Sequence, residues 1–166
     1  YEPGLEELVE RNSAAGRLDV TTDYGKGIPG AEFAFIAVGT PSGAAGEADM
    51  RYCEAAARAI AENATGSIII VNKSTMPIGA GDTINGIARE ALHGQFAVHV
   101  VSNPEFLREG SAVTDFLNPD RVVLGAVERA VAERVAELYR PLNAPMVLTD
   151  VRSAEMIKYG ANAFLA

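Results

Sequence analysis

The fold of this chain is decided by the stretch Phe33-Ala34-Phe35-Ile36-Ala37-Val38-Gly39-Thr40-Pro41. Its apolar run, closed by a glycine, a threonine and a proline, is typical of a strand that is buried on both faces and ends in a turn. Further strands are predicted at residues 68–71, 98–102 and 122–124, and helices at residues 50–62, 81–92 and 128–139. Because strands alternate with helices, we predict an α/β fold, half or more of a Rossmann-like, doubly wound parallel sheet. Such sheets bind ligands at the carboxyl ends of their strands.

Composition narrows the class of protein. With 166 residues, 48% of them hydrophobic, the chain is long enough for one domain, or for one domain plus a fragment. A net charge of −8 argues against binding to nucleic acid or to an anionic membrane. The single cysteine, Cys53, excludes a disulfide framework or a cysteine metal cluster and is expected to be a buried thiol. With no membrane span and no signal peptide in the sequence, we expect a cytoplasmic protein and no metal.

Polar and small residues collect where the predicted strands end. Gly39 and Thr40 follow the first strand, and Ser74, Thr75 and Gly79 follow the second. The helix predicted after Gly79 would favour an anion at its N-terminus. The alternative is that these residues only terminate strands, as they do in many loops. Their occurrence after successive strands favours a binding site.

Two carboxylates follow the third predicted strand. Glu105 and Glu109 are four residues apart, directly after Asn103-Pro104. Proline suits the first turn of a helix, so we expect residues 105–109 to form a helical turn with both carboxylates on one side. Such a pair can divide the roles of ionised group and proton-transfer group. The alternative is a helix cap with solvated carboxylates.

A fourth group lies near the end of the chain. Lys158 and Asn162 are four residues apart in a predicted helix that is capped by Ser153 or Asp150. An ammonium and a carboxamide on one helix face can meet a single oxygen atom, which is the requirement for stabilising an oxyanion. Taken alone, Lys158 could equally be a solvated surface lysine.

These motifs, together with Tyr1-Glu2-Pro3-Gly4-Leu5 and Asn118-Pro119-Asp120-Arg121, resemble the UDP-glucose 6-dehydrogenase family in order and spacing over the whole chain. The resemblance implies an NAD-dependent oxidation of the primary alcohol of UDP-glucose to an acid, through a cysteine-linked thiohemiacetal and thioester. It also implies a homodimer or a larger oligomer. GDP-mannose and UDP-N-acetylhexosamine are the alternative substrates, and the segment at residues 118–121 favours UDP-glucose over GDP-mannose.

The resemblance assigns roles to individual residues. Glu105 matches the base for water attack on the thioester, a role that suits a carboxylate with Glu109 close enough to raise its pKa. Thr75 lies near the nicotinamide and its ordered water, and Lys158 and Asn162 match the residues that hold the developing oxyanion. The expected cofactor-binding residues are Val38, Gly39, Thr40, Ser74, Thr75 and Glu109. The expected substrate-binding residues are Phe106, Leu107, Arg108, Glu109, Lys158 and Asn162.

Parts that the family requires are not found in these 166 residues. The Gly-rich phosphate turn and the acidic residue that selects NAD over NADP would precede Tyr1, and the nucleophilic cysteine would follow Ala166. We therefore expect a truncated dinucleotide-binding domain at residues 1–151, without its first βαβ unit. Residues 152–166 would begin the long helix that leads to a central dimerisation domain. Such a chain is expected to be inactive alone. A catalytically silent nucleotide-sugar-binding module and a hydroxyacid dehydrogenase are the rival hypotheses.

Overall fold

The structure, a computed structural model, describes residues 1–42 and 48–165. Its five strands form one sheet in the order β1-β2-β3-β4-β5. The strands are β1 (Phe33–Ile36), β2 (Ile68–Asn72), β3 (Val98–Ser102), β4 (Val122–Ala126) and β5 (Met146–Thr149). The helices are α1 (Leu5–Ala14), α2 (Tyr24–Gly27), α3 (Arg51–Asn63), α4 (Ala80–Leu92), α5 (Ala112–Leu117), α6 (Arg129–Tyr139), the 3-10 turn η1 (Arg140–Leu142) and α7 (Val151–Leu165).

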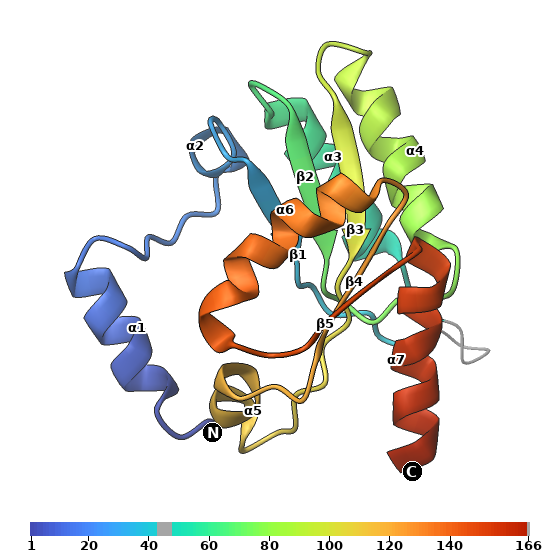
Figure 1. Cartoon of the computed structure of the whole chain (residues 1–166). Helices are drawn as coiled ribbons and strands as arrows, with labels where there is room; N and C mark the ends of the chain where they lie inside the picture. The colour runs from blue at the N-terminus through green and yellow to red at the C-terminus, as the bar shows by residue number, and fades with distance from the viewer. Residues whose placement is uncertain (43–47, 166) are drawn as a thin grey trace.

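The sheet is covered on both faces (Figure 1). Helices α3 and α4 pack on β1, β2 and β3 through one apolar cluster that includes Ile36, Ile70 and Ile84. Helix α6 packs on the other face through a second cluster that includes Val101 and Leu124. Helix α7 lies against β3 and β4, while α1 stands beside the body at the end of an extended segment (Figure 1). The predicted α/β Rossmann-like class is confirmed.

All four predicted strands and all three predicted interior helices are present, with ends that differ by one or two residues. The sequence reading missed α1, α2, α5 and β5. Its expectation that the first strand is buried on both faces is wrong, because Phe35 is 42% exposed. Helix α6 reaches Phe33 on that face but leaves Phe35 at the edge of the sheet. Cys53 is completely buried, as predicted, and this burial raises the pKa of its thiol.

One pair of strands is antiparallel, although a parallel sheet was predicted. β3 runs antiparallel to β4, whereas β1 with β2, β2 with β3, and β4 with β5 are parallel. Parallel neighbours need a crossover that returns the chain to the starting edge. The connection from β3 to β4 contains only the six-residue helix α5, which stays at the carboxyl edge of β3 (Figure 1). The chain therefore enters β4 from that edge.

Close packing of α7 on the sheet depends on Gly125 in β4. A Cβ atom at residue 125 would lie 2.5 Å from the Cβ of Ala154 and 2.5 Å from the carbonyl oxygen of Asp150. There is no space for a methyl group at this position. Helix α7 can therefore approach β4 this closely only because residue 125 has no side chain.

We predict that Gly125→Ala destabilises the fold by about 2 to 3 kcal/mol, as overpacking of a core does. The matched control is Gly86→Ala in α4, where a Cβ atom meets nothing within 4 Å. That change should stabilise the helix by about 0.5 to 1 kcal/mol. Urea unfolding of both variants measures the difference, and equal midpoints would show that α7 is not packed on β4 as described.

Candidate active site

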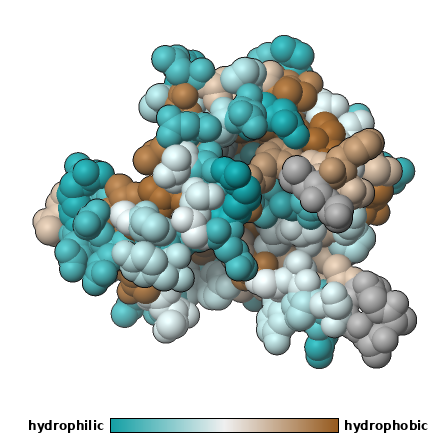
Figure 2. Space-filling view, turned by 90° about the horizontal axis from the view of Figure 1, so that it is seen from below, coloured by the Kyte–Doolittle hydropathy of each residue, from teal (hydrophilic) through white to brown (hydrophobic). Residues whose placement is uncertain are grey.

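The loops that follow β1 and β2 are tied together. The Ser74 hydroxyl donates to the carbonyl oxygen of Val38 at 2.7 Å, and the Thr40 hydroxyl donates to that of Thr75 at 2.8 Å. The backbone N–H of Ser74 also donates to the carbonyl oxygen of Ile36 at 3.1 Å. These hydrogen bonds join the two loops into one unit at the carboxyl edge of the sheet. From this side the surface is a mixture of hydrophilic and hydrophobic patches (Figure 2).

The centre of the site is an ion pair between the loop after β3 and helix α7. Lys158 Nζ donates to Glu105 Oε1 at 2.8 Å and to the backbone carbonyl oxygen of Glu105 at 2.6 Å. The Lys158 residue is only 8% exposed, so the reading of Lys158 as a solvated surface lysine is wrong. A buried ammonium requires a partner of opposite charge or a polar cage, and Glu105 provides both contacts.

The expected helical turn at residues 105–109 is not formed. Residues 103–108 have no regular secondary structure. Instead, Glu105 Oε2 accepts the backbone N–H of Leu107 at 2.7 Å, which folds the carboxylate back onto its own loop. Glu109 is exposed in the following turn. The prediction that Glu105 and Glu109 share one side of a helix, so that Glu109 raises the pKa of Glu105, is therefore wrong.

The pKa of Glu105 is lowered and not raised. Burial alone would raise its pKa, but the hydrogen bonds from Lys158 and from the Leu107 N–H, with the charges of Lys158 and Lys73, hold the pKa below its ordinary value. Lys73, at the end of β2, is desolvated by burial, which lowers the pKa of its ammonium. Its Nζ lies 5.9 Å from the ring centroid of Tyr139. The Glu105 carboxylate thus lies in contact with Lys158 and within reach of the charge of Lys73.

A buried hydrogen-bond network fixes the start of the Glu105 loop. Asn103 is 1% exposed. Its backbone N–H donates to the carbonyl oxygen of Asn72 at 2.8 Å and its Nδ2 donates to that of Val123 at 3.0 Å. Its Oδ1 accepts the hydroxyl of Tyr139, whose pKa is raised to about 12 by burial. With both ends of its amide satisfied, Asn103 sets the direction in which Pro104 and Glu105 leave the sheet.

The far end of the same loop is held by the N-terminal segment. Glu2 accepts the N–H of Gly110 at 2.6 Å and that of Ala112 at 2.9 Å. Arg108 forms a two-pronged pair with Asp115, at 3.0 Å and 2.7 Å. The carboxylate of Glu2 thus connects the motif at residues 1–5 to the motif that contains Glu105.

The remaining predicted site residues differ in how far they are exposed to solvent. The Phe106 ring lies near two cations, with Arg121 Cζ 4.7 Å and Lys158 Nζ 5.7 Å from its centroid. Leu107 and Asn162 are exposed, and Gly39 is exposed with open space beside its Cα. The structure thus brings Glu105 together with Lys158, and Val38 and Thr40 with Ser74 and Thr75. It does not bring Asn162 or Glu109 into contact with Glu105.

Four residues of the site were not singled out from the sequence. Lys73 precedes the predicted site residue Ser74, and Glu155 lies three residues before the predicted Lys158, but the roles of both depend on burial, which the sequence does not show. Both line a small cavity at this edge of the sheet, together with Thr75, Ser102 and Lys158. Asn103 has a role in the sequence-based hypotheses only in the alternative of a helix cap. The signal for Tyr139 is that its hydroxyl is the one polar side-chain group on the buried, apolar face of α6.

The loops leave space for a cofactor beside Gly39, where an added Cβ atom would meet nothing within 4 Å. The Ser74 and Thr40 hydroxyls hold the two loops together, through the carbonyl oxygens of Val38 and Thr75. The described residues contain no group of three or more His, Cys, Asp or Glu side chains placed to hold a metal ion. Among the same residues, no helix is long and apolar enough to cross a membrane.

Comparison with known proteins gives a consistent result. Residues 1–143 match the family described as UDP-glucose/GDP-mannose dehydrogenase, NAD binding domain. Over all 166 residues the chain is 49% identical to a UDP-glucose 6-dehydrogenase of Bacillus subtilis and covers 36% of that protein. It is 48% identical to the UDP-glucose 6-dehydrogenase of Rhizobium meliloti and covers 39% of it. The chain therefore spans well under half the length of these relatives.

Solved structures agree with the fold. A UDP-glucose dehydrogenase from Pyrobaculum islandicum superimposes with a TM-score of 0.94 at 41% identity, over 99% of this chain and 39% of that one. A GDP-mannose dehydrogenase from Pseudomonas aeruginosa, solved as a ternary complex, superimposes with a TM-score of 0.93 at 34% identity, over 99% of this chain and 39% of that one.

Proposed function

Because residues 1–143 match its NAD-binding domain, the chain belongs to the UDP-glucose/GDP-mannose dehydrogenase family, and we propose that it is a piece of a UDP-glucose 6-dehydrogenase that carries part of the NAD site and the catalytic base. The observation that carries the proposal is the ion pair between buried Lys158 and half-buried Glu105, beside the two loops that are hydrogen-bonded to each other. NAD, when bound, accepts hydride from the sugar alcohol. We also propose that the active protein is a homodimer or larger and that residues 152–166 begin its central helical domain.

Lys158 and Asn162 would stabilise the substrate oxygen as negative charge develops on it. Lys158 can do so by shifting its hydrogen bonds from Glu105 to that oxygen. Glu105 then loses the group that most lowers its pKa, and it becomes a stronger base. A carboxylate of this kind can take a proton from the water that hydrolyses the thioester. The ion pair thus couples oxyanion stabilisation to base strength.

UDP-glucose is the proposed substrate because the similarity to UDP-glucose 6-dehydrogenases, 49% and 48% identity, exceeds the 34% identity to the GDP-mannose dehydrogenase. The nucleophilic cysteine would be supplied by a segment other than these 166 residues. Cys53 does not suit that role, because it is completely buried in α3.

A chimera tests the proposal. We would replace the matching 36% of the B. subtilis UDP-glucose 6-dehydrogenase with this chain and follow NADH at 340 nm. We expect turnover of UDP-glucose with two NADH per sugar, no turnover of GDP-mannose, and no NADH from the 166-residue chain alone. Preferential turnover of GDP-mannose would show that GDP-mannose, and not UDP-glucose, is the substrate. A folded chimera that binds UDP-glucose in calorimetry without turnover would support the silent binding module instead.

A further inference from the structure

Helix α4 begins without a side-chain cap of its own. Gly79 occupies the cap position with a φ of 94° and has no side chain that could accept a hydrogen bond from the first turn. The first N–H groups of a helix lack intrahelical partners, and the helix dipole favours a negative charge beside them. Here the missing partner comes from α7. Glu155, 6% exposed, accepts the N–H of Gly79 at 2.7 Å and that of Gly81 at 2.8 Å.

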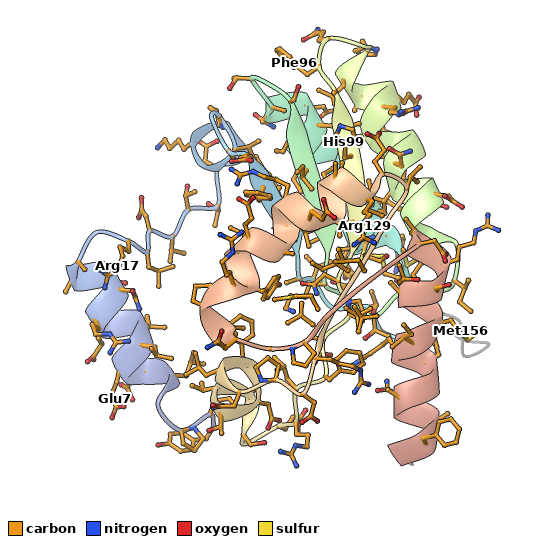
Figure 3. The ribbon with its side chains drawn as sticks, viewed as in Figure 1. Glu7, Arg17, Phe96, His99, Arg129 and Met156 are labelled. Atoms are coloured by element: carbon orange, nitrogen blue, oxygen red, sulfur yellow. The ribbon has the colours of Figure 1, made fainter. Side chains whose placement is uncertain are left out.

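This contact requires an unusually close approach of the two helices. A Cβ atom at residue 81 would lie 2.5 Å from Val151 Cγ1 and 3.1 Å from Glu155 Oε1. The absence of a side chain at Gly81 therefore allows the Glu155 carboxylate to reach the backbone of α4 directly. Met156, the next residue of α7, lies on its outer side and is 54% exposed (Figure 3).

Glu155 also precedes Lys158 by three residues, which places both on the same face of α7. One turn of α7 thus contacts the end of the loop at residues 73–79 through Glu155 and the Glu105 loop through Lys158. That first loop is itself bonded to the loop after β1 through Ser74. Hydrogen bonds and short stretches of backbone therefore connect the loop after β1 to Glu105 through Glu155, in addition to the bond between Asn103 and Asn72 at the start of the two loops.

We infer that Glu155 is a positioning residue, whose carboxylate sets the register between the cofactor loop at residues 73–79 and the Lys158–Glu105 pair. The catalytic half of this inference rests on the proposed function. Its structural half does not, because the contact between Lys158 and Glu105 can be followed without turnover. A carboxamide at residue 155 can accept only one of the two N–H groups and turns an N–H donor toward the other. Glu155→Gln should therefore shift α7 and loosen the ion pair.

The test measures the pKa of Glu105 by NMR in the full chain, and kcat and KM in the chimera. The groups that face Glu105 are Lys158 from α7, Lys73 from the end of β2, and the Leu107 N–H. With Glu155→Gln the pKa of Glu105 should rise by about half a unit or more as Lys158 withdraws. In the chimera kcat should fall about tenfold to a hundredfold, as small misplacements of reacting groups do, with KM for UDP-glucose changed less than about threefold.

The matched control is Arg152→Met. Arg152 also links α7 to α4, through Asp82 at 2.8 Å, but on the exposed surface. It should leave both the Glu105 titration and kcat unchanged. A Glu155→Gln variant that unfolds at lower temperature but retains the parent pKa of Glu105 would reduce Glu155 to a cap and overturn the inference. If Glu155→Gln does not fold, Glu155→Asp, which keeps the charge but shortens the reach, must raise the same pKa.

Discussion

Replacing Lys158 with methionine should lower kcat of the chimera about a hundredfold to a thousandfold, the usual cost of removing one oxyanion donor. Methionine retains most of the buried aliphatic stem, so packing is largely preserved. An ammonium gains most when its partner oxygen carries charge, which is the condition of the transition state. KM for UDP-glucose should therefore change less than about threefold. Steady-state kinetics with UDP-glucose at saturating NAD measure both quantities.

The pH profile separates the two functions of Lys158. Because Lys158 lowers the pKa of Glu105, its removal raises that pKa, and the acid limb of the kcat profile should move to higher pH. Well above the new pKa the carboxylate is ionised again, so the loss that remains there belongs to the oxyanion. Lys26→Met, in the exposed helix α2, is the control and should leave kcat unchanged. If Lys158→Met retains kcat within about threefold, far short of a lost oxyanion donor, Lys158 only stabilises the fold.

The sheet could be predicted from the sequence because its strands are short, continuous apolar runs bounded by turn residues. Residues 68–71 and 122–124 lie in strands that are buried throughout. The antiparallel entry into β4 could not be predicted, because it depends on where a six-residue helix lies and not on periodicity. The strand β5 was missed for another reason. Its four residues are only partly buried or exposed, and Pro145 precedes it directly.

The site was predictable in its parts but not in its pairing. Glu105 and Lys158 were each noticed beside a residue four positions away, because helical spacing is the only proximity that a sequence displays. Their actual partners are each other, across 53 residues. That contact requires α7 to pack on β4 through Gly125 and to meet α4 through Gly81. Close approaches of this kind come from tertiary packing, and so the pKa of Glu105 was predicted with the wrong sign.

Glu105→Gln is the second large expected effect. The carboxamide retains the shape of Glu105, and its Oε1 can still accept from Lys158 at 2.8 Å, so the loop should keep its conformation. What it loses is the ability to take a proton from water. Removal of a general base usually costs about a hundredfold or more, so kcat should fall by at least that factor while the first oxidation continues.

The expected signature is a burst of NADH followed by stalled turnover, with a sugar adduct on the protein in mass spectrometry. The pH dependence provides an independent check. In the parent, activity should decline on the acid side only as pH falls through the lowered pKa of Glu105, and Glu105→Gln should abolish that limb. Glu109→Gln is the matched control, since Glu109 is exposed and has no contact with Glu105 in the described part of the chain. If Glu105→Gln turns over normally while Glu109→Gln stalls after the burst, the base is Glu109. The loop after β3 would then have to refold around the substrate to bring Glu109 inward.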